Sequence, residues 1–346
     1  MGATYNLCLV GFGNVGRELV RLLEDKREVL REEHGIEWRI TGVASRRMGW
    51  LAKPEGFESA ELLRIGADSS GSAGLKAAAT NGVRGWLRAA RADVLFEMTS
   101  LNRQTGQPAI EHLQAALELG AHAISANKGP VVYALHDLNS LATKVGKRFL
   151  FESAVMDGTP IFNLFRETLP AVNLRGFRGL LNSTSNVVLT EMEAGRSFAE
   201  AVRRAQEIGV AETDPSDDLE GWDPAVKVCA LCNVLMGASL RPADVERVGI
   251  ATVSPEASRD ARAAGRPYKL VCSARRDGDA IRARVAPEQL LLSDPLASMK
   301  GTTSAIFFDM DVFGLSIIEH KPGVIATAYG LMSDFVRAVG TTDEHR

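Results

Sequence analysis

A glycine-rich turn between an apolar run and an amphipathic stretch restricts the fold more than any other feature of the sequence. The run is residues 6–10 (NLCLV), the turn is residues 11–16 (GFGNVG), and apolar residues follow at helical spacing up to Gly35. In this context the glycines allow a tight turn, close approach of a diphosphate and packing of helix on strand. The helix N-terminus offers N–H donors and a positive dipole end. The turn therefore predicts a dinucleotide site rather than a glycine-rich turn without a ligand. The predicted contacts are Gly11, Phe12, Gly13, Asn14, Val15 and Gly16.

Alternating strand and helix patterns continue through the first half of the chain. Strands are expected at residues 38–44, 93–98, 122–125 and 148–152, helices at 107–119 and 133–146, and two further helices across 48–90 around the sequence SSGSAG. Such alternation is typical of a doubly wound parallel sheet of the Rossmann type. We therefore expect an α/β protein whose residues 1–152 form a dinucleotide-binding domain.

The second half of the chain predicts a different architecture. Strands are expected at residues 174–182, 268–275, 280–285, 304–310 and 314–320, and helices from 183, over 197–208 and over 325–339. Asp277-Gly278-Asp279 predicts a hairpin turn. A chain of 346 residues is too long for one typical core. We expect residues 153–321 to form a C-terminal α+β catalytic and dimerisation domain, and a helix within residues 322–346 to complete the first domain.

Composition narrows the class of protein. The net charge of −3 and the lack of a basic run with interleaved aromatic residues argue against a nucleic-acid surface. No apolar stretch reaches the roughly 18 residues of a membrane span. The N-terminus enters a strand without the basic region of a signal peptide. Four cysteines are too few for a disulfide scaffold, so we expect a cytoplasmic protein without a membrane partner.

Residues at the ends of the predicted strands suggest how a dinucleotide would be held. Arg46 and Arg47 follow the strand at 38–44, where an NAD site would carry Asp or Glu. Arginine suits a 2′-phosphate, so the sequence favours NADP, with NAD and two ordinary surface arginines as the alternatives. Thr99, Ser100 and Lys128 follow two other strands, at the edge of the sheet that faces ligands in open α/β folds. A surface loop lysine is the alternative for Lys128.

An acidic stretch at residues 205–227 carries the candidate proton-transfer group. Asp223-Pro224 has the pattern of a helix start, which places Lys227 one turn after Asp223 on the same helix face. A cationic acid/base beside a carboxylate would suit a small substrate with an ammonium group and a reacting oxygen. A solvated acidic loop with an exposed ion pair is the alternative. The acidic residues are Glu212, Asp214, Asp217, Asp218, Glu220 and Asp223.

Cysteine and histidine positions argue against several other chemistries. Cys229 and Cys232 form a single CxxC on an apolar helix pattern, with no second pair or nearby histidine, so core packing is expected rather than a metal site. The six histidines are scattered, and zinc-enzyme and serine-hydrolase arrangements lack their parts. Neither Cys8 nor Cys272 is placed as an activated nucleophile.

Several motifs together resemble the homoserine dehydrogenase family, the NAD(P)-linked oxidoreductases of the aspartate pathway to threonine and methionine. They are GFGNVG at 11–16, ANKGP at 126–130, ESAVMDGTP at 152–160, GLLNSTSN at 179–186 and GVAETDPSDDLEGWDPAVK at 209–227. The last matches the family pattern without a gap. The resemblance is to short members without a regulatory domain, and it implies interconversion of L-homoserine and L-aspartate 4-semialdehyde by a dimeric or larger enzyme. The apolar strands at 304–318 favour a homodimer formed through the second domain.

The resemblance also implies roles for individual residues. Lys227 would be the proton donor and acceptor, with Asp223 beside it and Lys128 at the nicotinamide side. Glu212, Asp218 and Thr184 would bind homoserine. Gly209 and Gly323 would contact the cofactor. Backbone carbonyls in the turn after residue 151 would bind a sodium ion, and the implied ligands are Glu152, Val155, Asp157 and Thr159.

The sequence departs from the family pattern in four places. Val210 replaces a tyrosine, Ser183 replaces a glycine, Met156-Asp157 replace small residues, and residues 320–324 replace a glycine-rich turn. Two alternatives stay open, and these departures are the features that support the second of them. One is another NAD(P)-linked amino-acid or semialdehyde dehydrogenase, and the other is a dinucleotide sensor without turnover.

Overall fold

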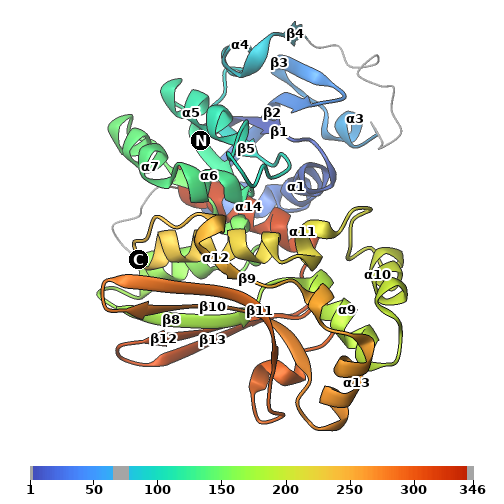
Figure 1. The fold of residues 1–346 in the computed structure, drawn as a ribbon. Coiled ribbons are helices and arrows are strands. Elements are labelled where there is room, and N and C mark those ends of the chain that lie inside the picture. Colours follow the sequence, from blue (N-terminus) through green and yellow to red (C-terminus); the bar gives the residue numbers. More distant parts are fainter. Residues whose placement is uncertain (1–2, 65–77, 341–346) are drawn as a thin grey trace. The chain divides into compact units, whose positions relative to one another are not determined.

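The computed structural model describes residues 3–64 and 78–340. The chain divides into two units, Met1–Ile161 together with Gly323–Arg346, and Phe162–Pro322 (Figure 1). We had expected the first domain to end at residue 152, and the division lies after Ile161. No helix in the described ranges has both the length and the apolar character needed to cross a membrane.

The first unit is built on a seven-stranded sheet, counted over the described residues, in the order β4-β3-β2-β1-β5-β6-β7. Five neighbouring strands, β2, β1, β5, β6 and β7, are parallel to one another. Strand β3 is antiparallel to both of its neighbours, β2 and β4. The expected parallel α/β sheet is therefore present with an antiparallel edge. The bounds are β1 Ala3–Val10, β2 Ile36–Ser45, β3 Gly49–Phe57, β4 Ala78–Thr80, β5 Val94–Glu97, β6 His122–Ser125 and β7 Phe149–Leu150.

Helices connect these strands, and one returns from the far end of the chain. Their bounds are α1 Asn14–Asp25, α2 Arg27–His34, α3 Ser59–Arg64, α4 Gly82–Ala90, α5 Ala109–Glu118, α6 Lys128–Tyr133, α7 Leu135–Lys144, the 3-10 turn η1 Glu152–Ala154, and α14 Val324–Val339. The short α8 Ile161–Asn163 lies at the division between the units. The long helix expected after the glycine turn is two helices, and the second ends at Gly35 in a left-handed conformation.

Two helices lie on either side of SSGSAG, as predicted, but the strands β3 and β4 in this region were not predicted. Residues 49–57 form β3, which follows β2 through the Arg46-Arg47-Met48 turn, and the two helices are α3 and α4. The sequence SSGSAG lies outside the described residues. Strand β3 contains Pro54, and its pairing with β2 skips residues 53–56. A proline in such an irregularity removes no ladder hydrogen bond, which is why the strand tolerates it.

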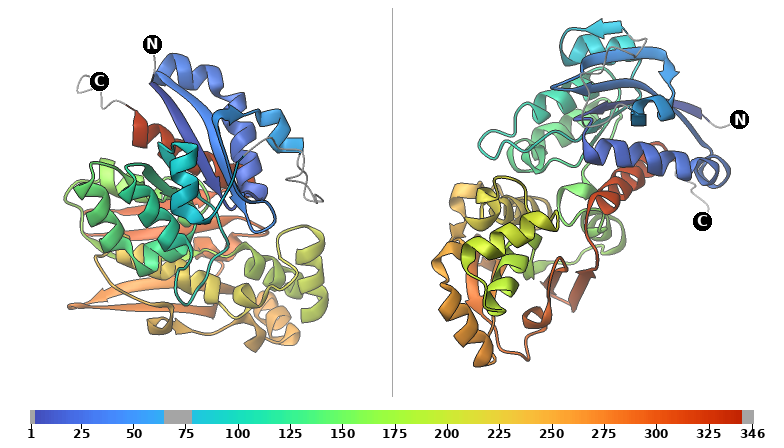
Figure 2. Two further views of the ribbon diagram at one scale, coloured as in Figure 1. Left: turned by 90° about the horizontal axis from the view of Figure 1, so that it is seen from above. Right: turned by 90° about the vertical axis from the view of Figure 1, so that its right-hand side faces the viewer.

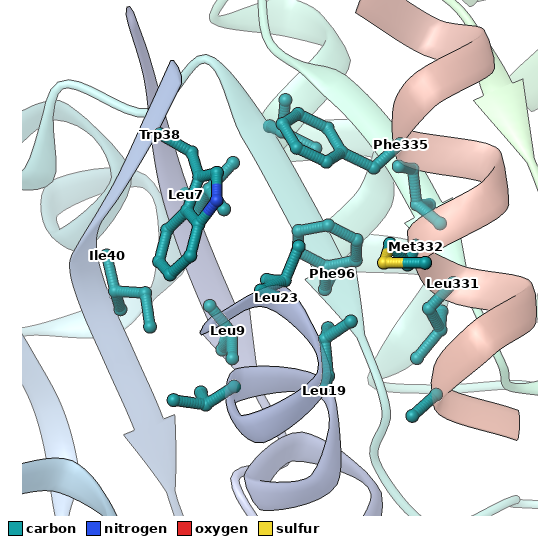
Figure 3. Close-up of a cluster of buried hydrophobic side chains, with 14 of the residues drawn as sticks. Leu7, Leu9, Leu19, Leu23, Trp38, Ile40, Phe96, Leu331, Met332 and Phe335 are labelled. Carbon is teal, nitrogen blue, oxygen red and sulfur yellow. The ribbon is translucent and has the colours of Figure 1, made fainter. Parts of the chain in front are cut away.

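The core of the first unit joins β1, β2 and β5 to α1 and α14 (Figure 3). Leu19 and Leu23 of α1 are four residues apart, so both face Leu7 and Leu9 of the sheet. The ring of Phe335 from α14 makes edge contacts with Tyr5 and Phe96. Figure 2 shows α14 beside α1, and the two helices pack together. The C-terminal helix is therefore part of the first unit's core.

The second unit is an antiparallel sheet in the order β13-β12-β8-β10-β11-β9, except that the short β9 is parallel to β11. The bounds are β8 Leu174–Leu180, β9 Glu246–Arg247, β10 Tyr268–Asp277, β11 Ala280–Gln289, β12 Ser304–Met310 and β13 Gly314–Glu319. The predicted hairpin is confirmed: Asp277 pairs with Ala280 around a two-residue turn, and Gly278 has a φ of 60° that suits such a turn.

Helices of the second unit pack on this sheet and carry the predicted catalytic and substrate-binding residues Thr184, Asp218, Asp223 and Lys227. Helix α12 contacts β10 and β11, and α9 contacts β10 (Figure 1). The bounds are the π-turn η2 Leu164–Thr168, α9 Ser183–Glu193, α10 Phe198–Glu207, α11 Ser216–Leu219, α12 Trp222–Leu235, η3 Pro242–Asp244, η4 Ile250–Thr252, α13 Pro255–Ala263 and η5 Pro295–Ser298.

Candidate functional site

The glycine turn of the first unit has the backbone geometry of a ligand-binding loop. Gly11 has a φ of 84°, and a Cβ there would lie 2.4 Å from the backbone carbon of Met98, so only glycine fits. The amides of Gly11 and Phe12 donate to the carbonyl of Ala44, at 2.9 and 3.1 Å, and tie the turn to β2. A Cβ on Gly16 would approach the ring of Phe12 to 3.2 Å, which fits its expected packing role.

The start of α1 suits a diphosphate. No side chain caps this helix, and its first turn contains no acidic residue. The N–H groups and the positive dipole end are therefore oriented for an anion. Arg46 and Arg47 lie exposed in the turn between β2 and β3, at the carboxyl end of β2. This position agrees with the one expected from the sequence.

Asn127 joins three of the predicted residues in the first unit. Its Nδ2 donates to the carbonyls of Thr99 and Ser100, at 2.9 and 3.4 Å. Its Oδ1 accepts from the amide of Gly129 and caps α6, the helix that begins at Lys128. Sequence reasoning passed over Asn127, although an asparagine directly before a helix is a known capping signal.

Glu97 is a second residue that sequence reasoning missed. Its side chain is fully buried at the end of β5, where Oε1 accepts from the amide of Thr99 at 3.2 Å and from the Thr99 hydroxyl. The Nδ1 atom of His112 lies 3.4 Å from the same oxygen. A buried carboxylate needs such partners. Glu97 therefore fixes the conformation of Thr99 at the carboxyl end of the strand.

The candidate proton-transfer pair lies on α12 of the second unit. Lys227 Nζ is 2.9 Å from Asp223 Oδ2 and 2.6 Å from the carbonyl oxygen of Leu181. The two side chains are only 18% and 19% exposed, so the pair differs from the solvated ion pair that was the alternative. The carbonyl of Leu181 fixes the ammonium in one position.

The expected start of this helix at Asp223 was wrong. The helix begins at Trp222, after Gly221 with a φ of 83°, and no side chain caps it. Asp223 and Pro224 lie in the first turn rather than at the cap and the first position. The left-handed conformation of Gly221 turns the chain into the helix. Asp223 is therefore held by Lys227 and Asn182, and it has no capping role.

Asn182 gathers the acidic side chains of this cluster. Its Nδ2 donates to Asp218 Oδ1 at 2.6 Å and to Asp223 Oδ2 at 3.2 Å. Burial raises the pKa of Asp218, and the charge of Asp223 raises it further. The Asn182 hydrogen bond, the charge of Lys227 and the Thr184 hydroxyl oppose that rise in pKa. The structure thus brings together Lys227, Asp223, Asp218 and Thr184.

The remaining predicted residues of the second unit lie in the loop after α10. Glu212 is exposed, and its backbone carbonyl accepts from Gln206 Nε2 at 3.2 Å. Gly209 has a φ of 73° directly after the C-cap of α10, and its amide donates to the carbonyl of Gln206. A glycine at this position ends a helix, so Gly209 has a structural role of its own. Thr184 donates to the carbonyl of Val210 and ties this loop to α9.

The turn at residues 152–159 contacts the start of α14 within the first unit. Met156 and Asp157 have φ values of 53° and 50°, which glycine adopts more easily. Asp157 accepts from the Gly323 amide at 2.6 Å and from the Thr327 hydroxyl at 3.1 Å. In the described part of the chain, no group of three or more His, Cys, Asp or Glu is arranged to hold a metal ion. Gly323 is thereby a backbone partner of Asp157.

All four cysteines are free and buried. Burial raises the pKa of Cys232 and of Cys272 to about 12, and raises the pKa values of Cys8 and Cys229 as well. A buried thiol with a raised pKa is a poor nucleophile. This agrees with the expectation that none of these cysteines carries covalent chemistry.

Comparisons with known proteins place this geometry in a family. The family described as homoserine dehydrogenase matches residues 160–336, and the homoserine dehydrogenase NAD binding domain matches residues 11–152. The chain is 36% identical to the NAD(+)-dependent homoserine dehydrogenase of Pseudomonas canavaninivorans, covering 96% of this chain and 95% of the relative. It is 31% identical to the homoserine dehydrogenase of Methanocaldococcus jannaschii, covering 97% and 99%.

A solved structure agrees with these sequence matches. A protein of Archaeoglobus fulgidus, assigned provisionally as a homoserine dehydrogenase, is similar with a TM-score of 0.85 and 30% identity. The match covers 97% of this chain and 99% of that one. The matches span both units, the dinucleotide loop and the lysine–carboxylate cluster. The chain belongs to the homoserine dehydrogenase family.

Proposed function

We propose that this chain catalyses the NAD(P)-dependent interconversion of L-homoserine and L-aspartate 4-semialdehyde. The observation that carries the proposal is the low-exposure Lys227–Asp223 pair, with the lysine also bound to the carbonyl of Leu181. Family membership supplies the reaction. On this proposal the protein is a cytoplasmic enzyme of the aspartate pathway to threonine and methionine.

Lys227 moves the proton in this reaction. When the semialdehyde is reduced, the Lys227 ammonium gives a proton to the aldehyde oxygen, and when homoserine is oxidised the neutral amine takes the hydroxyl proton. A dinucleotide held by the first unit would supply the hydride for reduction of the aldehyde and would accept it in the other direction. Asp223 and the Leu181 carbonyl hold the lysine at the reacting oxygen. Alcohol and oxidised cofactor thus give aldehyde, reduced cofactor and one proton.

Acidic residues bind the ammonium group of the substrate on this proposal. Asp218 lies in the buried cluster, and Thr184 joins it from α9. Glu212 adds a carboxylate on the neighbouring loop. Because Glu212 is exposed, Glu212→Gln should weaken homoserine binding by up to about tenfold and leave dinucleotide affinity unchanged. An equal loss for both ligands, measured by titration calorimetry, would assign Glu212 a structural role instead.

The first unit binds the dinucleotide on this proposal. The glycine turn and the start of α1 hold the diphosphate, while Thr99, Ser100 and Lys128 lie towards the nicotinamide. Gly209 and Gly323 are further proposed contacts. Arg46 and Arg47 support a preference for NADP, although the relative from Pseudomonas canavaninivorans is named as NAD(+)-dependent. No step is assigned to sodium, whose implied ligands are backbone carbonyls of the turn at residues 152–159.

A homodimer formed through the second unit is also proposed. Strand β13 is an edge strand of the sheet, and it carries the exposed Ile318. Val312 and Phe313, in the turn that precedes β13, are exposed as well. An edge with apolar side chains is suited to pairing with a second copy. Analytical ultracentrifugation that finds a stable monomer at micromolar concentration would contradict this proposal.

A steady-state assay tests the proposed reaction. Wild-type protein should form reduced cofactor when given homoserine and NADP+ or NAD+, with one semialdehyde formed per hydride transferred. Phosphate-dependent oxidation of the semialdehyde instead would indicate the other class of dehydrogenase, although its nucleophilic cysteine has no counterpart among these buried thiols. Tight binding of dinucleotide without turnover of homoserine would indicate a sensor.

A further inference from the structure

The connection between β8 and α9 contacts each part of the proton-transfer cluster. Leu181, Asn182 and Thr184 are close neighbours in the chain, but their partners come from α12, α11 and the loop after α10. Leu181 accepts from Lys227, and Asn182 donates to Asp218 and Asp223. The hydroxyl of Ser183 donates to the carbonyl of Thr302 at 3.1 Å and anchors the connection on its other side.

Asn182 is the buried centre of this connection, and the residue is 7% exposed. The carbonyl oxygen of its side chain accepts from the Ser185 amide at 2.8 Å and caps α9. The amide nitrogen donates to two carboxylates on two other helices. Two carboxylates that share one donor are held at short range despite their mutual repulsion.

We propose that Asn182 is a positioning residue for proton transfer: its amide nitrogen holds Asp218 and Asp223 together beside Lys227, while its carbonyl oxygen fixes the start of α9. This inference rests on the proposed function, because it assigns Lys227 the proton. Asn182 touches neither substrate nor cofactor in this role, and it acts through the two aspartates.

Asn182 also sets the charge of the substrate-binding carboxylate. The pKa of Asp218 is raised by burial and by Asp223, and the hydrogen bond from Asn182 opposes that rise. The charged groups that act on Asp218 are Asp223 and Lys227, both on α12. Loss of the Asn182 donor therefore moves the pKa of Asp218 upward. An ionised Asp218 is the form that would attract the substrate ammonium.

Two substitutions separate the donor from the cap. Asn182→Ser and Asn182→Asp both keep a good capping oxygen, but neither keeps the amide donor. In the direction of semialdehyde reduction, Asn182→Ser should lower kcat about tenfold and shift the acid limb of kcat/KM upward by about one pH unit. Asn182→Asp adds a third carboxylate and should shift the acid limb of kcat/KM further upward in pH.

A second buried asparagine provides the matched control. Asn233 is also 7% exposed and also bonds through both ends of its amide, to the backbone of Leu240. It lies near the end of α12, away from the acidic cluster. Asn233→Ser should lower the melting temperature and leave the pH profile where it is in wild type. A purely structural Asn182 would behave in the same way.

The titration of Asp218 is read independently of turnover by carboxyl 13C NMR, with Asp218→Asn used to assign the resonance. The inference requires the Asp218 pKa to rise in Asn182→Ser relative to wild type, and equal titration in the two folded proteins overturns it. If wild type shows no activity with homoserine but the Asp218 titration shifts, the proposed function fails and the coupling of Asn182 to Asp218 stands. Should Asn182→Ser fail to fold, Asn182→Asp gives the same comparison.

Discussion

The candidate site of the first unit consists mainly of backbone groups, whereas that of the second unit consists of side chains. In the first unit the ligand-facing groups are mainly backbone: the left-handed Gly11, the N–H groups at the start of α1, and a turn tied to β2 through the carbonyl of Ala44. In the second unit they are side chains with little exposure, and each holds another: Lys227, Asp223, Asp218 and Asn182.

This difference decides which changes each site tolerates. A backbone site loses its shape only when a substitution changes the main chain, because most side chains along it contribute little. A side-chain cluster loses its function when any one partner is removed, since the remaining groups are no longer held in position by one another. We therefore expect substitutions of single charges to have larger effects in the second unit than in the first.

The largest expected effect is that of Lys227→Met. The substitution keeps the aliphatic stem and removes the proton donor, so kcat should fall by 10²–10⁴-fold, roughly the usual contribution of general acid–base catalysis. Melting temperature and NADP affinity should stay near wild type. Asp223→Asn should show a substantial but smaller loss of turnover, and it carries no capping term, since Gly221 precedes the helix. A Lys227→Met protein with near-wild-type turnover would contradict the side-chain mechanism.

The second effect is a pH dependence of stability caused by Lys269, a buried lysine on β10 that contacts α9. Lys269 donates to Asn186 Oδ1 at 3.0 Å and to the Met299 carbonyl at 2.7 Å, and burial lowers its pKa from 10.5 to about 8. Between these values the unfolded chain keeps a proton that the folded protein has lost, so stability rises with pH. Below about pH 8 both states are protonated, and the penalty of the buried charge is constant.

Unfolding in urea at a series of pH values measures this contribution. The difference in unfolding free energy, wild type minus Lys269→Met, should increase by on the order of 3 kcal/mol as the pH rises from about 8 to 10.5. Lys144→Met, at an exposed position on α7, is the control and should show no such trend. A constant difference across this pH range would show that Lys269 titrates as an exposed lysine does.

The sequence predicted features that depend on neighbouring residues better than features that depend on residues distant in the chain. The dinucleotide loop and the hairpin at residues 277–280 depend on neighbouring residues, and both were predicted from local patterns. The β3 strand was missed because its proline is tolerated only through an irregular pairing with β2. That pairing is a property of the folded sheet, and nothing in residues 48–57 alone reveals it.

The side-chain cluster was only partly predictable. Lys227 and Asp223 are one helical turn apart, so their pairing follows from spacing. Asn182 lies 36 and 41 residues before its two aspartate partners, and no local pattern connects them. Glu97 was read as one more position of an apolar strand, and only the fold shows Thr99 and His112 around its carboxylate. Long sequence separation accounts for missing Asn182, whereas Asn127 carried a local capping signal and Glu97 bonds to Thr99 only two residues away.

A smaller effect is expected when the backbone site is changed directly. Gly11→Ala forces a side chain into the left-handed region and against the backbone of Met98, so the turn must shift. We expect about a tenfold weaker dinucleotide affinity by fluorescence titration, because the N–H groups of the turn move out of position. Gly35→Ala is the matched control: Gly35 has a φ of 65°, and no atom lies within 4 Å of its added Cβ. That variant should lose stability alone, and equal dinucleotide affinities in the two variants would contradict the assignment of the turn.

The smallest effect is expected at Arg46, and it tests whether any side chain matters in the backbone site. Arg46 is exposed after β2, and contacts between exposed charges contribute about 0–1 kcal/mol. Arg46→Asp should therefore change the ratio of kcat/KM for NADP+ to that for NAD+ by only about three- to tenfold, in favour of NAD+. Arg31→Asp, an equal charge change on α2, should leave the ratio unchanged. High salt should reduce the effect, because a 2′-phosphate contact at the surface is screened. If the wild-type enzyme strongly prefers NAD+, two arginines after a strand do not identify a 2′-phosphate site. The relative from Pseudomonas canavaninivorans is named as NAD(+)-dependent.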